Sequence, residues 1–166
     1  GTASLTWLDF RQAIEQARAV RDALVKKLPS HKAKLDERFV ALEKDLLQLD
    51  QQLEAIVKQN PNKPVVGSHP VFQYLARRYG LNMESVHFEP NEMLAKAFEE
   101  FGKLLKNHPA KWMIWEDTPK QEIVAKLKTM GVDSALFLTT GNAPEKGDFL
   151  SQMRQNVENL KPVFAP

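Results

Sequence analysis

The feature that most constrains the fold is a seam of apolar residues whose spacing alternates strictly between four and three positions. Its members are Leu35, Phe39, Leu42, Leu46, Leu49, Leu53 and Ile56. This spacing places all of these side chains on one stripe of an α-helix. A looser pattern of the same kind runs from Phe10 to Leu28. The sequence therefore predicts two long helices, near residues 8–28 and 31–58.

The junction between these helices is too short for anything but a tight corner. Pro29 interrupts the first pattern, and Ser30 is of a residue type that often caps the N-terminus of a helix. We therefore predict an antiparallel hairpin with Ser30 as the N-cap of its second helix. We expect the apolar seam to pack against the rest of the same chain, and an intermolecular coiled coil is the alternative.

The pattern changes after residue 60, where the segment Asn60-Pro61-Asn62-Lys63-Pro64 ends the second helix. From there, short apolar runs alternate with longer amphipathic ones. The expected strands are 65–68, 83–88, 112–115 and 135–138, and the expected helices begin near Pro70, Asn91, Thr118 and Asp148. Four strand–helix units predict an α/β fold with a four-stranded parallel sheet and helices on both of its faces.

Two further expectations follow from this pattern. Trp112 and Trp115 lie three positions apart on one strand, so they cannot share a face of the sheet. The chain divides into a helical hairpin, residues 1–60, and a C-terminal α/β lobe, residues 61–166.

Composition excludes several classes of function. The 166 residues include 23 basic and 21 acidic side chains, for a net charge of +2, and the two signs are interspersed. There is no basic block or arginine–aromatic stripe of the kind that binds nucleic acid. The absence of cysteine excludes a thiolate metal site, a disulfide and a cysteine nucleophile. No nucleotide-binding, serine-hydrolase or zinc-protease motif occurs, so we predict a binding protein and not an enzyme.

Polar residues gather where the expected strands end, and ligands of open parallel sheets bind at that edge. They are Ser68 and His69, His87 and Glu89, Glu116 and Asp117, Thr139 and Thr140, and Asp148 at the start of the last helix. The types of His69, Glu116 and Asp148 suit a divalent cation. The alternative is structural: His69 as a loop residue, Asp148 as an N-cap, and Glu116 as a first-turn carboxylate.

The motifs, taken in order, resemble those of the periplasmic zinc- and manganese-binding proteins of ABC importers. Residues 67–81 read G-S-H-P-V-F-Q-Y-L-A-R-R-Y-G-L, similar to the S-S-H-D-A-F-x-Y-L-A-x-x-Y-G-L of that family. Residues 147–156 are similar to its G-D-Y-x-x-x-M-x-x-N. Shorter matches are Trp7-Leu8-Asp9 to H-x-W-L-D-P, Glu89-Pro90 to E-P-S, and Ile114-Trp115-Glu116 to F-V-E-P. The resemblance covers practically the whole chain and identifies it with the C-terminal half of these two-lobed proteins.

The resemblance implies an incomplete metal site. His69 and Asp148 fall on two of the family's four ligand positions, and Leu5 stands where a third ligand, a histidine, is expected. The fourth belongs to an N-terminal lobe that this sequence lacks. Glu116 falls on a glutamate expected to orient His69 from behind, and Glu89 and His87 are auxiliary candidates.

The expected function is therefore that of a half-size periplasmic relative that binds Zn²⁺ or Mn²⁺ weakly, or completes its site with a second subunit. An ABC permease and a homo-oligomer are the partners to consider. The alternative is a non-transport scaffold or interaction protein that kept the lobe and lost metal binding. A third reading, a piece cut from a full-length binding protein, is disfavoured by Leu5.

Overall fold

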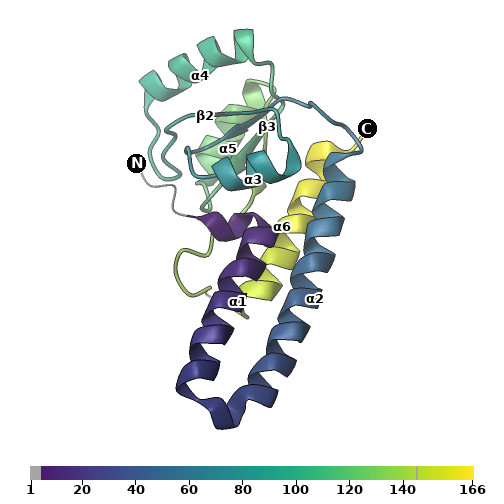
Figure 1. Cartoon of the computed structure of the whole chain (residues 1–166). Coiled ribbons are helices and arrows are strands. Elements are labelled where there is room, and N and C mark those ends of the chain that lie inside the picture. Colours follow the sequence, from purple (N-terminus) through teal and green to yellow (C-terminus); the bar gives the residue numbers. More distant parts are fainter. Residues whose placement is uncertain (1–4, 145) are drawn as a thin grey trace.

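The computed structural model describes residues 5–144 and 146–166 and shows a helical hairpin that projects from an α/β lobe (Figure 1). Helices α1 (Phe10–Lys27) and α2 (Lys32–Val57) form the hairpin and pack against each other along their length. Short 3₁₀ turns, η1 (Thr6–Leu8) and η2 (Pro29–His31), precede the two helices. The predicted antiparallel hairpin is confirmed.

The two helices of the hairpin begin differently. Asp9 caps α1, where its carboxylate accepts hydrogen bonds from the backbone N–H groups of Arg11 at 3.0 Å and Gln12 at 3.3 Å. The prediction that Ser30 caps α2 is wrong. Ser30 lies inside η2, and the residue that precedes α2 is His31, which makes no side-chain cap. Because Pro29 begins a 3₁₀ turn, Ser30 lies within that turn and not at the residue that precedes α2.

The lobe is built on a parallel sheet in the order β2-β1-β3-β4. Its strands are β1 (Val65–Gly67), β2 (Met83–Ser85), β3 (Trp112–Trp115) and β4 (Asp133–Leu136). The helices of the lobe are α3 (Gln73–Tyr79), α4 (Ala95–Asn107), α5 (Gln121–Thr129) and α6 (Phe149–Phe164). The α/β fold with four parallel strands is confirmed.

Several boundaries differ from the expected ones: α3 and α5 each begin about three residues later, and β2 ends at Ser85. Two further differences have a clear structural reason. Helix α4 begins at Ala95 and not near Asn91, because residues 86–94 form a loop that crosses the end of the sheet. Strand β4 begins at Asp133, two residues before the apolar run, because Asp133 pairs with Trp112 at the edge of the sheet. The apolar pattern in the sequence marks only the buried part of that strand.

Two hydrophobic cores lie on opposite faces of the sheet. On one face, Ile114 packs with α3, α6 and the apolar seam of α2, so hairpin and lobe share one core. On the other face, Met113 and Trp115 pack against α4 and α5. Trp112 contacts the first core and Trp115 belongs to the second, as the three-residue spacing predicted. The division of the chain at residue 60 stays a prediction.

A buried carboxylate also joins the hairpin to the lobe. Asp50 of α2 is 1% exposed and accepts hydrogen bonds from Arg78 and Tyr79 at the end of α3 and from Arg11 of α1. Burial opposes ionisation of Asp50, but the hydrogen bonds from Arg78, Arg11 and Tyr79 outweigh it and hold the pKa of this carboxyl below its usual range. The hairpin is therefore fixed to the lobe by polar contacts as well as apolar ones.

Among the described residues, no helix is long and apolar enough to cross a membrane.

Candidate metal centre

The candidate site lies at the carboxyl end of the sheet, where the order of the strands reverses. The chain passes from β1 to β2 on one side and then to β3 on the other side of β1, which makes the end of β1 the switch point where ligands of open α/β sheets bind. In the register of the sheet, Gly67 stands beside both Ser85 and Ile114. His69 and Glu116 each follow two residues later, so the two side chains emerge next to each other.

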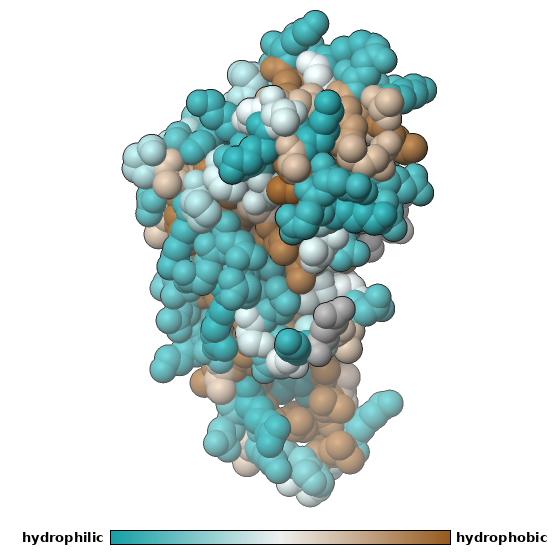
Figure 2. Space-filling view, turned by 180° about the vertical axis from the view of Figure 1, so that it is seen from behind, coloured by the Kyte–Doolittle hydropathy of each residue, from teal (hydrophilic) through white to brown (hydrophobic). Residues whose placement is uncertain are grey.

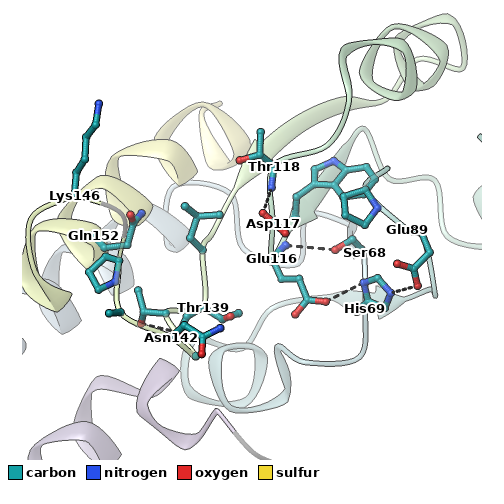
Figure 3. Close-up of a pocket in the computed structure, with 17 residues that line it drawn as sticks. Ser68, His69, Glu89, Glu116, Asp117, Thr118, Thr139, Asn142, Lys146 and Gln152 are labelled. Carbon is teal, nitrogen blue, oxygen red and sulfur yellow. Dashed lines mark hydrogen bonds and ion pairs between the residues drawn. The ribbon is translucent and has the colours of Figure 1, made fainter. Parts of the chain in front are cut away.

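His69 lies between two carboxylates (Figure 3). Its Nδ1 atom is 2.9 Å from Oε1 of Glu116, and its Nε2 atom is 3.4 Å from Oε1 of Glu89. The His69 side chain is 16% exposed, and its buried Nδ1 makes no aligned hydrogen bond to any described residue. Both ring nitrogens thus face negative charge, and the imidazole is held close to the surface.

Ser68 fixes the backbone beneath this arrangement. It is fully buried; its N–H donates to the carbonyl of Ile114, and its own carbonyl accepts from the N–H of Phe88, both at 2.9 Å. Its hydroxyl oxygen accepts from the backbone N–H of Glu116 at 3.4 Å. This residue, directly after β1, therefore contacts both of the segments that carry Glu116 and Glu89.

His87 is the other imidazole at this edge. Its exposed ring meets that of His69 edge to face, with 5.7 Å between the ring centroids. The two histidines and the two glutamates, His69, His87, Glu89 and Glu116, therefore come together at the ends of three adjacent strands, as the sequence predicted for the edge of the sheet.

A hollow of about 790 Å³ opens beside His69. Glu89 and Glu116 line it on the side of β1, and the loop after β4, including Thr139 and Asn142, lines the opposite side (Figure 3). Lys146 also reaches this hollow but points away from His69. Asn142, Lys146 and Gln152 were not among the predicted residues, because nothing in their local sequence shows that the loop after β4 folds towards β1.

Asp148 is placed apart from these residues. It is the N-cap of α6, where Oδ1 accepts from the N–H of Ser151 at 2.8 Å, and the Ser151 hydroxyl accepts in turn from the N–H of Asp148. The bonds from the Ser151 backbone and hydroxyl lower the pKa of Asp148. Asp148 is exposed and does not line the hollow. In this structure Asp148 therefore has the contacts of a helix N-cap, which was the structural alternative to a metal ligand.

The segment before α1 approaches the same hollow from the hairpin side. Leu5 packs partly buried against the main core, with a backbone φ of 27°. Trp7 donates its indole N–H to the carbonyl of Thr139 at 2.8 Å, which fastens the loop after β4. Trp7 belongs to a sequence motif, but its contact with Thr139 was not predictable, because only the fold brings together residues 132 positions apart.

Within residues 5–144 and 146–166, no three His, Cys, Asp or Glu side chains are arranged to hold a metal ion together. The donor set at the switch point, an imidazole with carboxylates on either side, suits Zn²⁺ or Mn²⁺ in type. However, too few of these side chains converge to form a complete metal site.

Comparison with known proteins decides the family. Residues 5–163 match the family model described as "ZnuA: Zinc-uptake complex component A periplasmic". The chain belongs to the ZnuA family. This membership confirms the resemblance seen in the sequence, and it confirms the prediction of a binding protein and not an enzyme.

The most similar ZnuA relatives include a zinc-binding protein, AdcA of Streptococcus pyogenes, which is 26% identical over 163 residues. That match covers 93% of this chain and 32% of AdcA. Among solved structures, the Zn(II)-bound ZnuA-like domain of Streptococcus pneumoniae AdcA superposes with a TM-score of 0.87 at 23% identity, covering 99% of this chain and 64% of that one. The metal-dependent lipoprotein YcdH of Bacillus subtilis superposes with a TM-score of 0.85 at 22% identity, covering 96% and 64%.

The chain thus spans about a third of the length of the curated ZnuA relatives it matches and just under two thirds of these solved structures. The structural similarity establishes the fold. The ligands of the full-length relatives are extended to this chain only as a proposal.

Proposed function

We propose that this chain carries the C-terminal share of a ZnuA-type metal site and binds Zn²⁺ or Mn²⁺ through the imidazole of His69. The observation that carries this proposal is the position of His69: at the switch point of the sheet, between two carboxylates, beside an open hollow. The names of the AdcA relatives as zinc-binding proteins support the choice of cation.

The contacts of His69 favour Nε2 as the atom that binds the metal. Nδ1 is buried next to Glu116, whereas Nε2 faces the more exposed Glu89. A histidine ligand normally directs its second nitrogen to a carboxylate, which fixes the tautomer and increases the basicity of the ring. Glu116 is placed to take that role, so we assign it to the orientation of His69.

Asp148 is the second ligand in this proposal. Its Oδ1 caps α6, and no described residue donates a hydrogen bond to Oδ2, which leaves that oxygen for a cation. Because Asp148 is exposed and does not line the hollow, it would reach the metal only together with a movement of the segment before α6. The cap would hold the start of α6 in place during that movement.

Two ligands leave the cation open to water, and tight zinc sites use three or four protein ligands. The position of Leu5 cannot supply another, since an alkyl side chain has no donor atom. We therefore propose that binding by this chain alone is weak, and that a second subunit or a further segment of polypeptide completes the site. A periplasmic location and delivery of the metal to an ABC permease complete the proposal, supported by the family's description.

Calorimetric titration of the chelator-treated protein with Zn²⁺ and Mn²⁺ tests the central claim. We expect binding with a dissociation constant below roughly 100 μM, about −5.5 kcal/mol, and its loss in His69→Ala. His31→Ala is the matched control, because His31 lies exposed at the distant corner of the hairpin. Binding weaker than this limit, or equal in the wild type and His69→Ala, would contradict the proposal.

A second function, that of an interaction protein, is favoured by the hairpin surface. Four large apolar side chains are exposed on the part of the hairpin that projects beyond the lobe: Val20, Leu24, Leu28 and Val40. Figure 2 shows apolar surface at this end of the molecule. Sedimentation at two protein concentrations, with and without Zn²⁺, tests self-association. A monomer under all conditions would contradict completion of the metal site by a second copy.

A further inference from the structure

The geometry points to Glu89 as a direct metal ligand that pairs with His69 and takes the place of a family ligand that this chain does not carry. This inference rests on the proposed function, because it concerns the same cation at the same imidazole. It adds a donor to that site: Glu89, in the segment after β2, binds the metal together with His69, in the segment after β1.

The distance between the two donor atoms fits a shared cation. Oε1 of Glu89 lies 3.4 Å from Nε2 of His69. A hydrogen bond between such atoms would bring them to about 2.7–3.2 Å. Two ligands bound at about 2.0–2.1 Å to one tetrahedral ion stand about 3.3–3.4 Å apart. The observed separation matches the spacing of two ligands on one zinc ion.

The backbone on both sides of Glu89 is held in place. The preceding Phe88 is buried, donates its N–H to the carbonyl of Ser68, and packs against Phe98, Phe101 and Trp115. The following Pro90 accepts a hydrogen bond from the N–H of Lys120 at 2.8 Å. Proline also restricts the residue before it to extended conformations. The side chain of Glu89 is 52% exposed, but its starting point is fixed.

The negative charge around His69 also favours a bound cation. Glu89 and Glu116 place two carboxylates around a single imidazole. The lysine that lines the same hollow, Lys146, points away from them (Figure 3). A divalent cation at Nε2 would compensate this charge, with Glu89 as its ligand and Glu116 behind Nδ1. The exposed ring of His87, edge-on to His69, borders the open side, where water would complete the coordination.

The test measures Zn²⁺ affinity by competition with a chromophoric chelator for the wild type and four variants. Glu89→Gln keeps the size of the side chain and removes its charge, and Glu92→Gln makes the same change at an exposed residue of the same loop. Asp148→Asn tests the family position, and His69→Ala removes the imidazole. We expect Glu89→Gln to weaken binding at least tenfold and Glu92→Gln to change it less than twofold. Asp148→Asn, at the second ligand of the proposed function, should also weaken binding.

Three results separate the inference from the proposal beneath it. If Glu89→Gln stays within twofold of the wild type while His69→Ala abolishes binding, the inference fails and the proposed function stands. If His69→Ala binds like the wild type, both fail. If Asp148→Asn weakens binding tenfold and Glu89→Gln does not, Asp148 and not Glu89 binds the metal beside His69, and the inference fails.

A spectroscopic measurement distinguishes a ligand from a residue that only shapes the loop. With Co²⁺ as the probe, loss of a protein ligand changes the intensity and position of the visible bands, whereas a change confined to the loop leaves them as they are. We expect the bands to change in Glu89→Gln and not in Glu92→Gln. Thermal unfolding in the presence of chelator should be the same for both variants, since Glu89 is half exposed.

Discussion

Asp50 on helix α2 accepts hydrogen bonds from Arg78 on helix α3 through both of its carboxylate oxygens, at 2.9 Å from Nε and 2.7 Å from Nη2. Arg11 on α1 donates to the same carboxylate at 2.7 Å. One buried side chain therefore joins both helices of the hairpin to the lobe. A bidentate arginine–carboxylate pair fixes orientation as well as distance.

The first prediction concerns this junction. Asp50→Ala should lower the free energy of unfolding by about 3 kcal/mol, the lower end of the range for breaking a buried pair. The lower end applies because Arg78 keeps 24% of its side chain exposed. Urea denaturation measures the effect. Asp45→Ala removes an exposed partner of Arg154 on the same helix and should cost less than about 1 kcal/mol. Equal losses in the two variants would show that the junction is not stabilising.

The second prediction is the acid dependence of the same contact. The pKa of Asp50 is lowered in the folded state, whereas an unperturbed aspartate, as in the unfolded chain, has a pKa of about 3.9. The stability contributed by Asp50 is therefore complete above about pH 4 and is lost as the pH falls through the lower, folded-state pKa. The difference in unfolding free energy between wild type and Asp50→Ala should be constant from about pH 5 to 7 and should shrink towards pH 3. A difference that does not change with pH would contradict this.

The third prediction separates the two roles proposed for Asp148. Asparagine caps helices as well as aspartate does, and alanine does not. Asp148→Asn should therefore leave thermal stability nearly unchanged, whereas Asp148→Ala should cost about 1 kcal/mol because the hydrogen bond to the Ser151 N–H is lost. Calorimetric melting curves in chelator measure both. If asparagine destabilised the protein as much as alanine, the carboxylate charge and not the cap would be the stabilising feature.

The fourth prediction concerns Gly67, the residue that ends β1 below His69. A Cβ atom there would lie 3.0 Å from Cδ2 of the buried Phe72 and 3.3 Å from the carbonyl oxygen of His69. Gly67→Ala should cost about 1–3 kcal/mol through overpacking and should weaken Zn²⁺ binding by displacing the imidazole. Gly141→Ala, where nothing lies within 4 Å of the added atom, is the control and should match the wild type in urea denaturation. A Gly67→Ala protein with normal stability and affinity would mean that the backbone at His69 adapts freely.

The sequence was most informative where local periodicity determines structure. The four–three seam predicted α2 almost to its ends, because side chains at this spacing form a single stripe only when the segment is an α-helix. The same reasoning failed at Ser30, since capping depends on the backbone geometry of a turn that Pro29 converts to 3₁₀. It also missed Asp9, which caps α1 although it stands within a recognised motif.

The candidate site was predictable in part for a topological reason. Parallel strands end at one edge, so His69, Glu116 and Glu89 could be expected to meet once the strands were recognised, and they do. The register, with Gly67 beside both Ile114 and Ser85, decided how closely they meet. No periodicity encodes a register between strands separated by a helix.

By itself, the sequence determined the α/β class, the hairpin, the membership of the ZnuA family and the residue types at the end of the sheet. All of these depend on local pattern or on motif. Only the tertiary structure decided that Oε1 of Glu89 lies 3.4 Å from Nε2 of His69, that Asp148 is engaged as a helix cap, and that Trp7 holds the loop after β4. The contacts of Glu89 with His69 and of Trp7 with Thr139 join segments that are separated in the chain, so packing of the lobe and not local sequence sets them.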